Sequence, residues 1–330
     1  MSTAPAGRNP GSGRLLLTIT PNAAVDITYR VDGFQLNRVH RPAETRTLAG
    51  GKGINVARVY RELGGQAFAS GFLGGRNGRL VARSLQRQGI PGRFARTAGE
   101  SRTCICIVDP LARTQTEVNE PGPEVSAHEV ERLCALVRRL LGRGGWSWLV
   151  LCGSLPPGAP PWLYAHLIET ARRAGVPAAL DASGEALREG LAARPALAKP
   201  NLVELGHAAG RALATLPDAL EAARRLRGTG IERVVVTLGG DGAFCVGPRG
   251  EWRCGAPAIR FVSAVGSGDS FLAAYLWALD KGQGDREALV LGVGAGAANA
   301  EVYGAGLCSR ERILGLADQA RPAEIRPGAR

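Results

Sequence analysis

The stretch SAVGSGDS, residues 263–270, places two glycines and a carboxylate directly before the apolar segment FLAAYLWAL. Glycine lets a backbone turn tightly, so the amides of Gly266, Ser267 and Gly268 are able to converge where we expect a helix to start, near Asp269. The amino end of a helix is the positive end of its dipole and attracts anions. The stretch therefore predicts an anion hole with an acid beside it, although Asp269 is equally suited to be a plain helix N-cap.

A second glycine-rich stretch, LAGGKGINVARVYRELGG, surrounds Lys52 ahead of a helical pattern. It is not a Walker A loop, because Arg46 stands where the first glycine of that motif belongs and Gly53 replaces the Ser or Thr that follows the lysine. Taken alone, this helix entry fits a turn as well as it fits a binding site.

Between these two stretches, LAKPNLVELG places Asn201 three residues before Glu204. On the first turn of a helix this spacing puts an amide and a carboxylate on one face, where they are suited to orienting water around Mg²⁺. The same spacing serves an N-cap with a capping-box glutamate. The residues themselves leave both interpretations open.

The elements that must position these residues follow a β-then-α rhythm from Leu15 onward. Short β-type runs at residues 15–20, 67–73, 146–154, 176–183 and 232–239 alternate with helical patterns such as residues 54–65, 78–89 and 160–175. This rhythm predicts an α/β fold in which helices cover both faces of a mostly parallel sheet.

Two segments, at about 26–49 and 93–120, interrupt this rhythm with β-type runs that have no helix between them. We expect them to form a small antiparallel sheet that projects from the core as a lid. Residues 1–13 are rich in Gly, Pro, Ser and Ala and are predicted to be a disordered tail, which leaves residues 14–330 as a single domain.

Composition restricts the class of protein. The net charge is +12, but the arginines alternate with acidic residues, as in VERLCALVRRL, which argues against a nucleic-acid-binding surface and suits an anionic substrate. The seven cysteines form no CxxC pair and fit reduced thiols. No apolar run approaches the roughly 20 residues that span a bilayer, and the start of the chain lacks the apolar core of a secretory signal. We therefore expect a cytoplasmic protein that binds neither nucleic acid nor membrane.

Six ordered motifs give the chain a family resemblance. GGKGINVAR, CGSLPPG, LDASGEAL, KPNLVEL, VVVTLGGDGA and VGSGDSF resemble, in this order, the motifs of the PfkB (ribokinase-like) carbohydrate kinases, and the likeness runs from about Leu15 to Leu307. GGKGINVAR, NEPGP and GSLPPG are most similar to the branch that contains 1-phosphofructokinase, tagatose-6-phosphate kinase and the PfkB-type 6-phosphofructokinase. The resemblance implies a ribokinase-like three-layer α/β/α core with a β-sheet lid, often clasped in a homodimer, and transfer of the ATP γ-phosphoryl group to a sugar phosphate.

The resemblance also implies roles for individual residues. Asp269 would be the catalytic base beside the anion hole of Gly266, Ser267 and Gly268, and Asn201 and Glu204 would serve Mg²⁺. Lys199 would lie beside the ATP phosphates, in a nucleotide site that also includes Asn201, Thr237, Gly239 and Gly242. The sugar would be held by Asp26, Gly51, Lys52 and Asn55. Its phosphate would be contacted by Arg41, Arg102, Lys52 and Ser154.

Three positions depart from the family pattern without removing a group that has an implied role. TPNAAVD lacks the usual proline before Asp26, Cys152 replaces the first serine of SGSLPPG, and Ser267 stands where alanine is commoner. They put the details of the substrate in doubt more than the type of reaction.

Two other functions remain open from the sequence. A ribokinase or adenosine kinase of the same superfamily would share Asp269 and its glycines but would not need Arg41, Arg102 and Lys52 around the sugar, since such cations suit a phosphorylated acceptor. A non-catalytic sugar-phosphate sensor would not need Asp269 or the pair Asn201 and Glu204. We therefore expect an ATP-dependent kinase whose acceptor is fructose 1-phosphate, fructose 6-phosphate or tagatose 6-phosphate.

Overall fold

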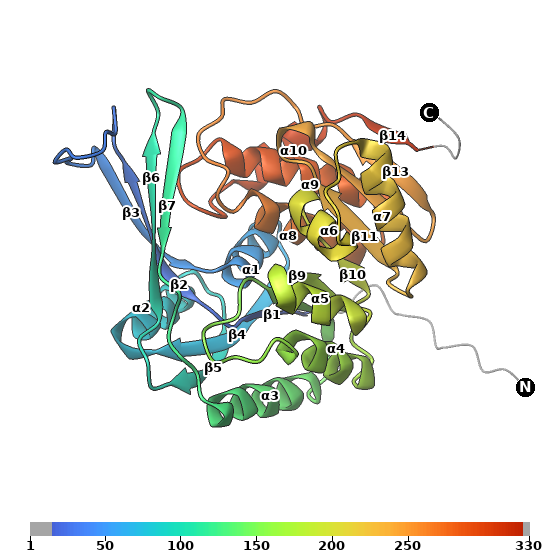
Figure 1. Ribbon diagram of the computed structural model, residues 1–330, viewed down its shortest axis with the longest axis horizontal. Helices are drawn as coiled ribbons and strands as arrows, with labels where there is room; N and C mark the ends of the chain where they lie inside the picture. The colour runs from blue at the N-terminus through green and yellow to red at the C-terminus, as the bar shows by residue number, and fades with distance from the viewer. Residues whose placement is uncertain (1–14, 326–330) are drawn as a thin grey trace, which may run out of the picture.

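Residues 15–325 form one large and one small β-sheet (Figure 1). The computed structural model describes residues 15–325, so the tail predicted for residues 1–13 lies outside the described residues. The large sheet has the strand order β14-β13-β12-β11-β10-β9-β8-β1-β4-β5.

The central part of the large sheet is parallel. Its parallel strands are β5 (Gly92–Thr97), β4 (Gln66–Gly74), β1 (Leu15–Thr20), β8 (Trp146–Cys152), β9 (Ala178–Asp181), β10 (Leu197–Ala198) and β11 (Arg233–Thr237). Three antiparallel strands extend it: β12 (Ala243–Gly247), β13 (Gly250–Cys254) and β14 (Pro322–Glu324). The prediction of a mostly parallel sheet is confirmed.

Helices cover both faces of this sheet, because its central strands are apolar on both sides. Leu16 packs into the core of one face, whereas Leu17 and Ile19 pack into the core of the other, as the period-two alternation of a strand requires. The first face carries α1 (Lys52–Glu62), α2 (Gly75–Arg87), α8 (Ser267–Asp280), α9 (Asp285–Ala300) and α10 (Arg310–Ala317). The second carries α3 (Ala127–Leu141), α4 (Leu163–Arg173), α5 (Gly184–Ala192), α6 (Leu202–Ala209) and α7 (Leu216–Gly228). The predicted three-layer α/β/α core is confirmed.

The small sheet, called the lid below, stands beside α1 and α8 at the left of Figure 1. It has the order β3-β2-β6-β7, from β2 (Ala24–Arg30), β3 (Glu44–Gly50), β6 (Arg102–Asp109) and β7 (Thr114–Asn119). The hairpins β2–β3 and β6–β7 are antiparallel, but β2 and β6 run parallel, so the sheet is mixed and the expectation of an antiparallel one is wrong. The reason is that the chain returns to the core between β3 and β6 and enters the lid twice in the same direction.

The expected boundary of the second lid segment also needs correction. Residues 92–97 form β5, which pairs in parallel with β4 at the edge of the large sheet. The lid part of that segment therefore begins at Arg102, not near residue 93, because the apolar positions of β5 are needed against the helices of the core.

The carboxyl ends of the parallel strands and the amino ends of α1, α6 and α8 point toward the region that the lid covers. Asp181 ends β9, Lys199 follows β10 and Thr237 ends β11. Ligands of open parallel sheets bind at this edge. Within residues 15–325, no helix has both the length and the apolar character needed to cross a bilayer.

Candidate active site

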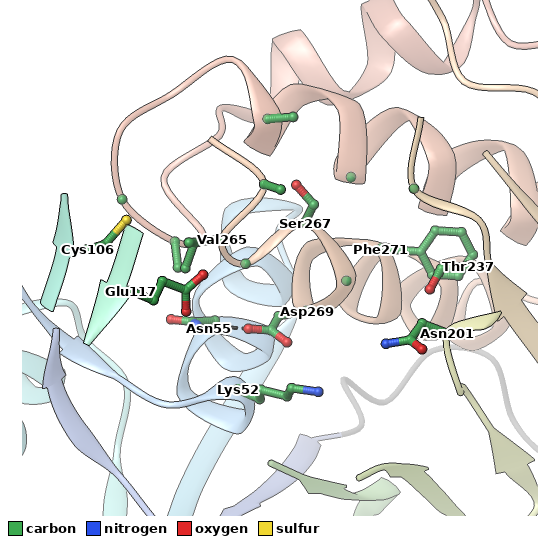
Figure 2. Close-up of a pocket in the computed structure, with 18 of the residues that line it drawn as sticks. Lys52, Asn55, Cys106, Glu117, Asn201, Thr237, Val265, Ser267, Asp269 and Phe271 are labelled. Atoms are coloured by element: carbon green, nitrogen blue, oxygen red, sulfur yellow. Dashed lines mark hydrogen bonds between the residues drawn. The ribbon is translucent and has the colours of Figure 1, made fainter. Parts of the chain in front are cut away.

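A cavity of about 870 Å³ lies between the lid and the carboxyl edge of the large sheet (Figure 2). The residues predicted from the sequence that line it are Asp26, Gly51, Lys52, Asn55, Arg102, Lys199, Asn201, Glu204, Thr237, Gly239, Gly242, Gly266, Ser267, Gly268 and Asp269. The fold thus gathers side chains from both glycine-rich stretches, from the lid and from the strand ends around one space.

The turn before α8 has a conformation that requires glycine. Gly266 is the N-cap with φ of 82°, and a methyl group added there would lie 2.5 Å from Ala305 Cβ. The Ser267 amide donates to Ala264 O over 3.1 Å, which closes the turn and uses one of the three amides expected in the anion hole. Asn299 of α9 donates to Val265 O over 2.7 Å and to Ser267 Oγ over 3.2 Å, so hydrogen bonds from α9 hold the residues on either side of Gly266.

Asp269 occupies the first turn of α8 and is almost completely buried. Its Oδ2 accepts a hydrogen bond of 2.9 Å from Asn55 Nδ2, which Figure 2 shows as the dashed line between α1 and α8. Burial raises the pKa of Asp269 to about 6, because removal from water disfavours the charged carboxylate, while Lys52 and the Asn55 hydrogen bond act in the opposite direction. The group is mostly ionised at neutral pH but is a stronger base than an exposed aspartate.

Two lysines share one buried carboxylate next to Asp269. Lys52 Nζ lies 3.0 Å from Asp181 Oδ1, and Lys199 Nζ lies 3.1 Å from Asp181 Oδ2. Burial acts to raise the pKa of Asp181, but the two ammonium groups hold it below its usual value. The charge of Asp181 in turn raises the pKa of Lys52. A methyl group on Gly268 would lie 3.5 Å from Lys199 Nζ, so this cation adjoins the amino end of α8.

The lid side of the cavity carries Asp26 on β2 and Arg102 on β6. Burial raises the pKa of Asp26 to about 6, and the nearby charges of Arg58 and Arg102 counteract part of that rise. Arg102 Nε donates to Asn22 O over 3.2 Å, and Arg102 Nη1 donates to Glu120 O over 3.1 Å. One guanidinium group is therefore anchored at the entrance of the lid.

The opposite end of the cavity lies at the start of α6 and the end of β11. Asn201 Oδ1 accepts from the Glu204 amide and Glu204 Oε2 accepts from the Asn201 amide, each over 2.8 Å, so this pair forms a capping box. The backbone of Asn201 also pairs, in parallel, with that of Thr237 at the end of β11. Gly239 and Gly242 have positive φ values of 61° and 89°. Pro257, Ile259 and Phe261 add an apolar wall.

Two predicted residues do not line the cavity of this chain. Arg41 is exposed in the loop between β2 and β3. Ser154 is exposed after β8, where its Oγ accepts a hydrogen bond of 3.3 Å from Asn22 Nδ2. Because Arg102 also contacts Asn22, Ser154 is close to the cavity rim, whereas Arg41 is not brought to the site by any contact within residues 15–325.

Sequence reasoning missed Asp181, Arg58 and Glu117. Asp181 lies in the motif LDASGEAL, and an acid at the end of a buried strand is the signal that identifies it. Arg58 lies three residues after Asn55 on α1, a spacing that places both on one helix face. Glu117 of β7 lines the cavity from the lid and is held by Gln115 Nε2 over 2.7 Å, a contact between residues two apart on one face of the strand.

Comparison with known proteins identifies the family. Residues 20–312 match the sequence profile described as "pfkB family carbohydrate kinase". The chain belongs to the pfkB family of carbohydrate kinases.

Individual pfkB kinases and their structural relatives extend this result. A 1-phosphofructokinase from Rhodobacter capsulatus is 39% identical over 284 residues, which cover 85% of this chain and 90% of that protein. Phosphofructokinase-2 from Escherichia coli, solved in complex with fructose-6-phosphate, has a TM-score of 0.85 and 28% identity over 93% of this chain and 99% of its own. A ribokinase from Arabidopsis thaliana, complexed with ribose and ATP, has a TM-score of 0.69, covers 92% of this chain and 98% of its own, and is 22% identical, which shows likeness of fold alone. The predicted ribokinase-like fold and the predicted pfkB family are both confirmed.

Proposed function

We propose that this pfkB kinase transfers the γ-phosphoryl group of ATP to a hydroxyl of a phosphorylated ketohexose, with fructose 1-phosphate as the first candidate acceptor. The observation that carries the proposal is the placement of Asp269, a buried acid at the amino end of α8, in one cavity with the cations Lys52 and Arg102. Such an arrangement suits an acceptor that has a hydroxyl at one end and a phosphate at the other. The 39% identity to a 1-phosphofructokinase favours fructose 1-phosphate over fructose 6-phosphate and tagatose 6-phosphate.

Asp269 is assigned the role of general base. A sugar hydroxyl is a weak nucleophile, and a carboxylate that accepts its proton during transfer typically contributes about 10²–10⁴ in rate. Asn55 occupies Oδ2 of Asp269. The other oxygen, Oδ1, is therefore the atom to which we assign the proton of the acceptor hydroxyl.

The amino end of α8 is assigned to the migrating phosphoryl group. The amides of Gly266 and Gly268 and the hydroxyl of Ser267 surround this end of the cavity, and Lys199 adjoins it. Fixed donors and cations of this kind stabilise charge that develops in the transition state, at roughly 10²–10³ in rate for each donor. Phosphoryl transfer depends mostly on such positioning and charge stabilisation.

The nucleotide is assigned to the end of the cavity near β11. Thr237, Gly239, Gly242 and Asn201 line this end, where the glycines allow close approach of a ligand and the apolar wall suits a base ring. Lys199, two residues before Asn201, adjoins the amino end of α8, which suits contact with the polyphosphate chain of ATP.

A magnesium ion fits Asn201 and Glu204 only together with the nucleotide. The capping box uses Asn201 Oδ1 and Glu204 Oε2, and within residues 15–325 Glu204 Oε1 makes no hydrogen bond. Mg²⁺ keeps several waters and is usually held by one or two carboxylates plus substrate phosphates, so one carboxylate oxygen and a water-orienting amide suffice. When bound, the ion would neutralise charge on the phosphates.

The sugar phosphate is assigned to the lid side. Asp26 and Asn55 face the sugar hydroxyls together with Gly51, and Lys52 and Arg102 face the phosphate, with Ser154 at the rim. Arginine binds phosphate in a bidentate manner, which suits recognition of the group that distinguishes a sugar phosphate from a free sugar.

Arg41 requires a second subunit if it is to reach a phosphate. Leu36 and Val39 of the same lid loop are 82% and 90% exposed, and Val118 of β7 is 58% exposed. Apolar side chains of this size on a projecting sheet favour contact with another lid. We therefore propose a homodimer formed through the lids, in which the partner contributes Arg41. Sedimentation of the Val39→Asp variant tests it: a dimer that persists contradicts the proposal.

A cytoplasmic location fits this function. All seven cysteines lie within the described residues as free thiols, which suits a reducing compartment, and ATP is the proposed co-substrate.

The experiment that tests the proposed function is a screen for ADP release with purified protein and Mg·ATP. The acceptors are the three ketohexose phosphates named above, with fructose, ribose and adenosine as unphosphorylated controls. We expect the phosphorylated ketohexoses to give the highest kcat/KM. Ribose or adenosine as the best acceptor would indicate the alternative kinase, and binding of a sugar phosphate without ADP release would indicate a sensor.

A further inference from the structure

Arg58 of α1 is a buried arginine that lies behind the site, not in it. It is 9% exposed and its guanidinium group donates four hydrogen bonds, to side chains and carbonyls from four different segments. Within residues 15–325 no carboxylate lies at ion-pair distance from it, and burial lowers the pKa of Arg58 to about 10. Keeping a cation in such a place costs stability, which suggests that its contacts serve a purpose.

The first contact fixes the amide of Asn55. Arg58 Nη1 donates to Asn55 Oδ1 over 2.9 Å, and Asn55 Nδ2 donates to Asp269 Oδ2 over 2.9 Å. A guanidinium group has only donors, so the Asn55 atom that faces Arg58 must be the oxygen and the atom that faces Asp269 must be the nitrogen. Arg58 therefore selects the orientation of Asn55 in which Asp269 receives a hydrogen bond on one oxygen and keeps the other for a ligand.

Two further contacts hold the surroundings of the anion hole. Arg58 Nη1 also donates to Ala305 O over 2.7 Å, and Ala305 is the residue against which Gly266 packs. Arg58 Nη2 donates to Ala49 O over 2.6 Å, near the end of lid strand β3 and just before Gly51. One guanidinium group thus links the partner of Asp269, the wall behind Gly266 and the root of the lid.

We propose that Arg58 is a positioning residue for phosphoryl transfer, which acts through Asn55 on Asp269 and through Ala305 on the turn at Gly266. The proposal rests on the proposed function, because it needs Asp269 to act as the base. Removal of Arg58 should therefore change the protonation of Asp269 as well as the stability of the fold.

The charged groups around Asp269 come from several elements. Lys52 approaches from α1, Asp181 from the end of β9 and Lys199 from the segment after β10. Asn299 of α9 is neutral and contacts Ser267, two residues before Asp269. In an Arg58→Met variant these groups remain. The Asn55 amide is then free to rotate and to present its oxygen to the carboxylate, which disfavours the charged form of Asp269. Activity then requires a higher pH.

The test is the pH dependence of kcat/KM for the sugar phosphate between pH 5 and 9. We expect the acidic limb of Arg58→Met to lie about one pH unit above that of the unsubstituted enzyme. At pH 7, kcat should fall at least about tenfold, while KM for ATP should stay within about twofold. The matched control is Arg233→Met, which removes another largely buried arginine, one that pairs with Asp285 over 2.7 Å and does not line the cavity. This control should lower the melting temperature without moving the limb.

A double-mutant cycle tests whether the effect passes through Asn55. In an Asn55→Ala background, Arg58→Met should move the acidic limb by less than half of the shift it causes alone. Equal shifts in both backgrounds, or a limb that matches that of Arg233→Met, would overturn the proposal. If Arg58→Met does not fold, Arg58→Lys carries the same test, because one ammonium group cannot replace all four hydrogen bonds. An unsubstituted enzyme without activity on any sugar phosphate would instead refute the proposed function.

Discussion

The Ser263 hydroxyl donates a hydrogen bond of 2.7 Å to Gln115 Oε1 and so joins the loop before α8 to lid strand β7. Ser263 is buried, and its oxygen also accepts from the Val265 amide over 3.3 Å. On the other side, Gln115 Nε2 donates to Glu117, which lines the cavity. A continuous chain of hydrogen bonds thus connects the lid to the residue immediately before Gly266.

Gln115→Ala should loosen the lid more than it changes the chemistry. A neutral hydrogen bond contributes about 0.5–1.5 kcal/mol, so we expect KM for the sugar phosphate to rise roughly 2- to 10-fold while kcat changes less. Amide hydrogen exchange in residues 114–119 should become faster. Thr116→Ala, at the next position and on the opposite face of the strand, is the control. Unchanged exchange and KM in Gln115→Ala would show that the contact does not hold the lid.

Asp269→Asn should abolish most of the turnover and little of the binding. The amide keeps the size of the carboxylate but does not accept the hydroxyl proton, so kcat should fall by at least about 10². Steady-state kinetics and calorimetric titration with the sugar phosphate measure the two quantities. Asp318→Asn, at an exposed position after α10, should behave as the unsubstituted enzyme. Normal turnover in Asp269→Asn would remove its assignment as the base.

Arg102→Ala should discriminate between phosphorylated and free sugars. If the guanidinium group contacts the phosphate of the acceptor, KM for the sugar phosphate should rise at least about tenfold, because charge-assisted hydrogen bonds contribute about 1.5–3 kcal/mol. Turnover of free fructose, measured in parallel, should change little. Arg30→Ala removes an exposed lid arginine that pairs with Asp32 and serves as the control. Equal losses with both acceptors would point to a structural role at Asn22.

The sequence predicted those parts of the site that depend on local patterns. The turn at Gly266 and the start of α8 follow from glycine spacing and an apolar run, and the core follows from the β-then-α rhythm. The spacing of Asn201 and Glu204 fits both a helix cap and a metal site, and the structure contains the two hydrogen bonds of the cap.

What the sequence could not supply are contacts between distant residues. Asp181 pairs with Lys52 across 129 positions, and Arg58 reaches Ala305 across 247. The parallel pairing of β2 with β6 likewise depends on how the chain returns from the core. Such relationships arise only when the sheet order brings the segments together.

Asp26→Asn should make the protein more stable at neutral pH, in a way that depends on pH. The pKa of Asp26 in the folded state is about 6, above its ordinary value of 3.8, so the folded state holds this proton more tightly than the unfolded chain does. Between pH 3.8 and pH 6 the free energy of unfolding falls as pH rises. Above pH 6 Asp26 is ionised in both states, and the full cost of keeping its charge in the folded protein remains. With a difference of about two pKa units, this cost is on the order of 1–3 kcal/mol, since Asp26 is only partly exposed to solvent. An asparagine does not carry the charge.

Urea titrations of Asp26→Asn and the unsubstituted protein at pH 7.5 and pH 4 measure this difference. The variant should have the higher free energy of unfolding at pH 7.5, and its advantage should largely disappear at pH 4, where Asp26 of the folded protein is protonated and carries no charge. Asp32→Asn, at an exposed position of the lid, should show no such pH-dependent gain. The stabilised variant should also bind the sugar phosphate more weakly, because Asp26 is proposed to contact the sugar hydroxyls. An advantage that is equal at both pH values would contradict this account of Asp26, because a loss of strain does not depend on protonation.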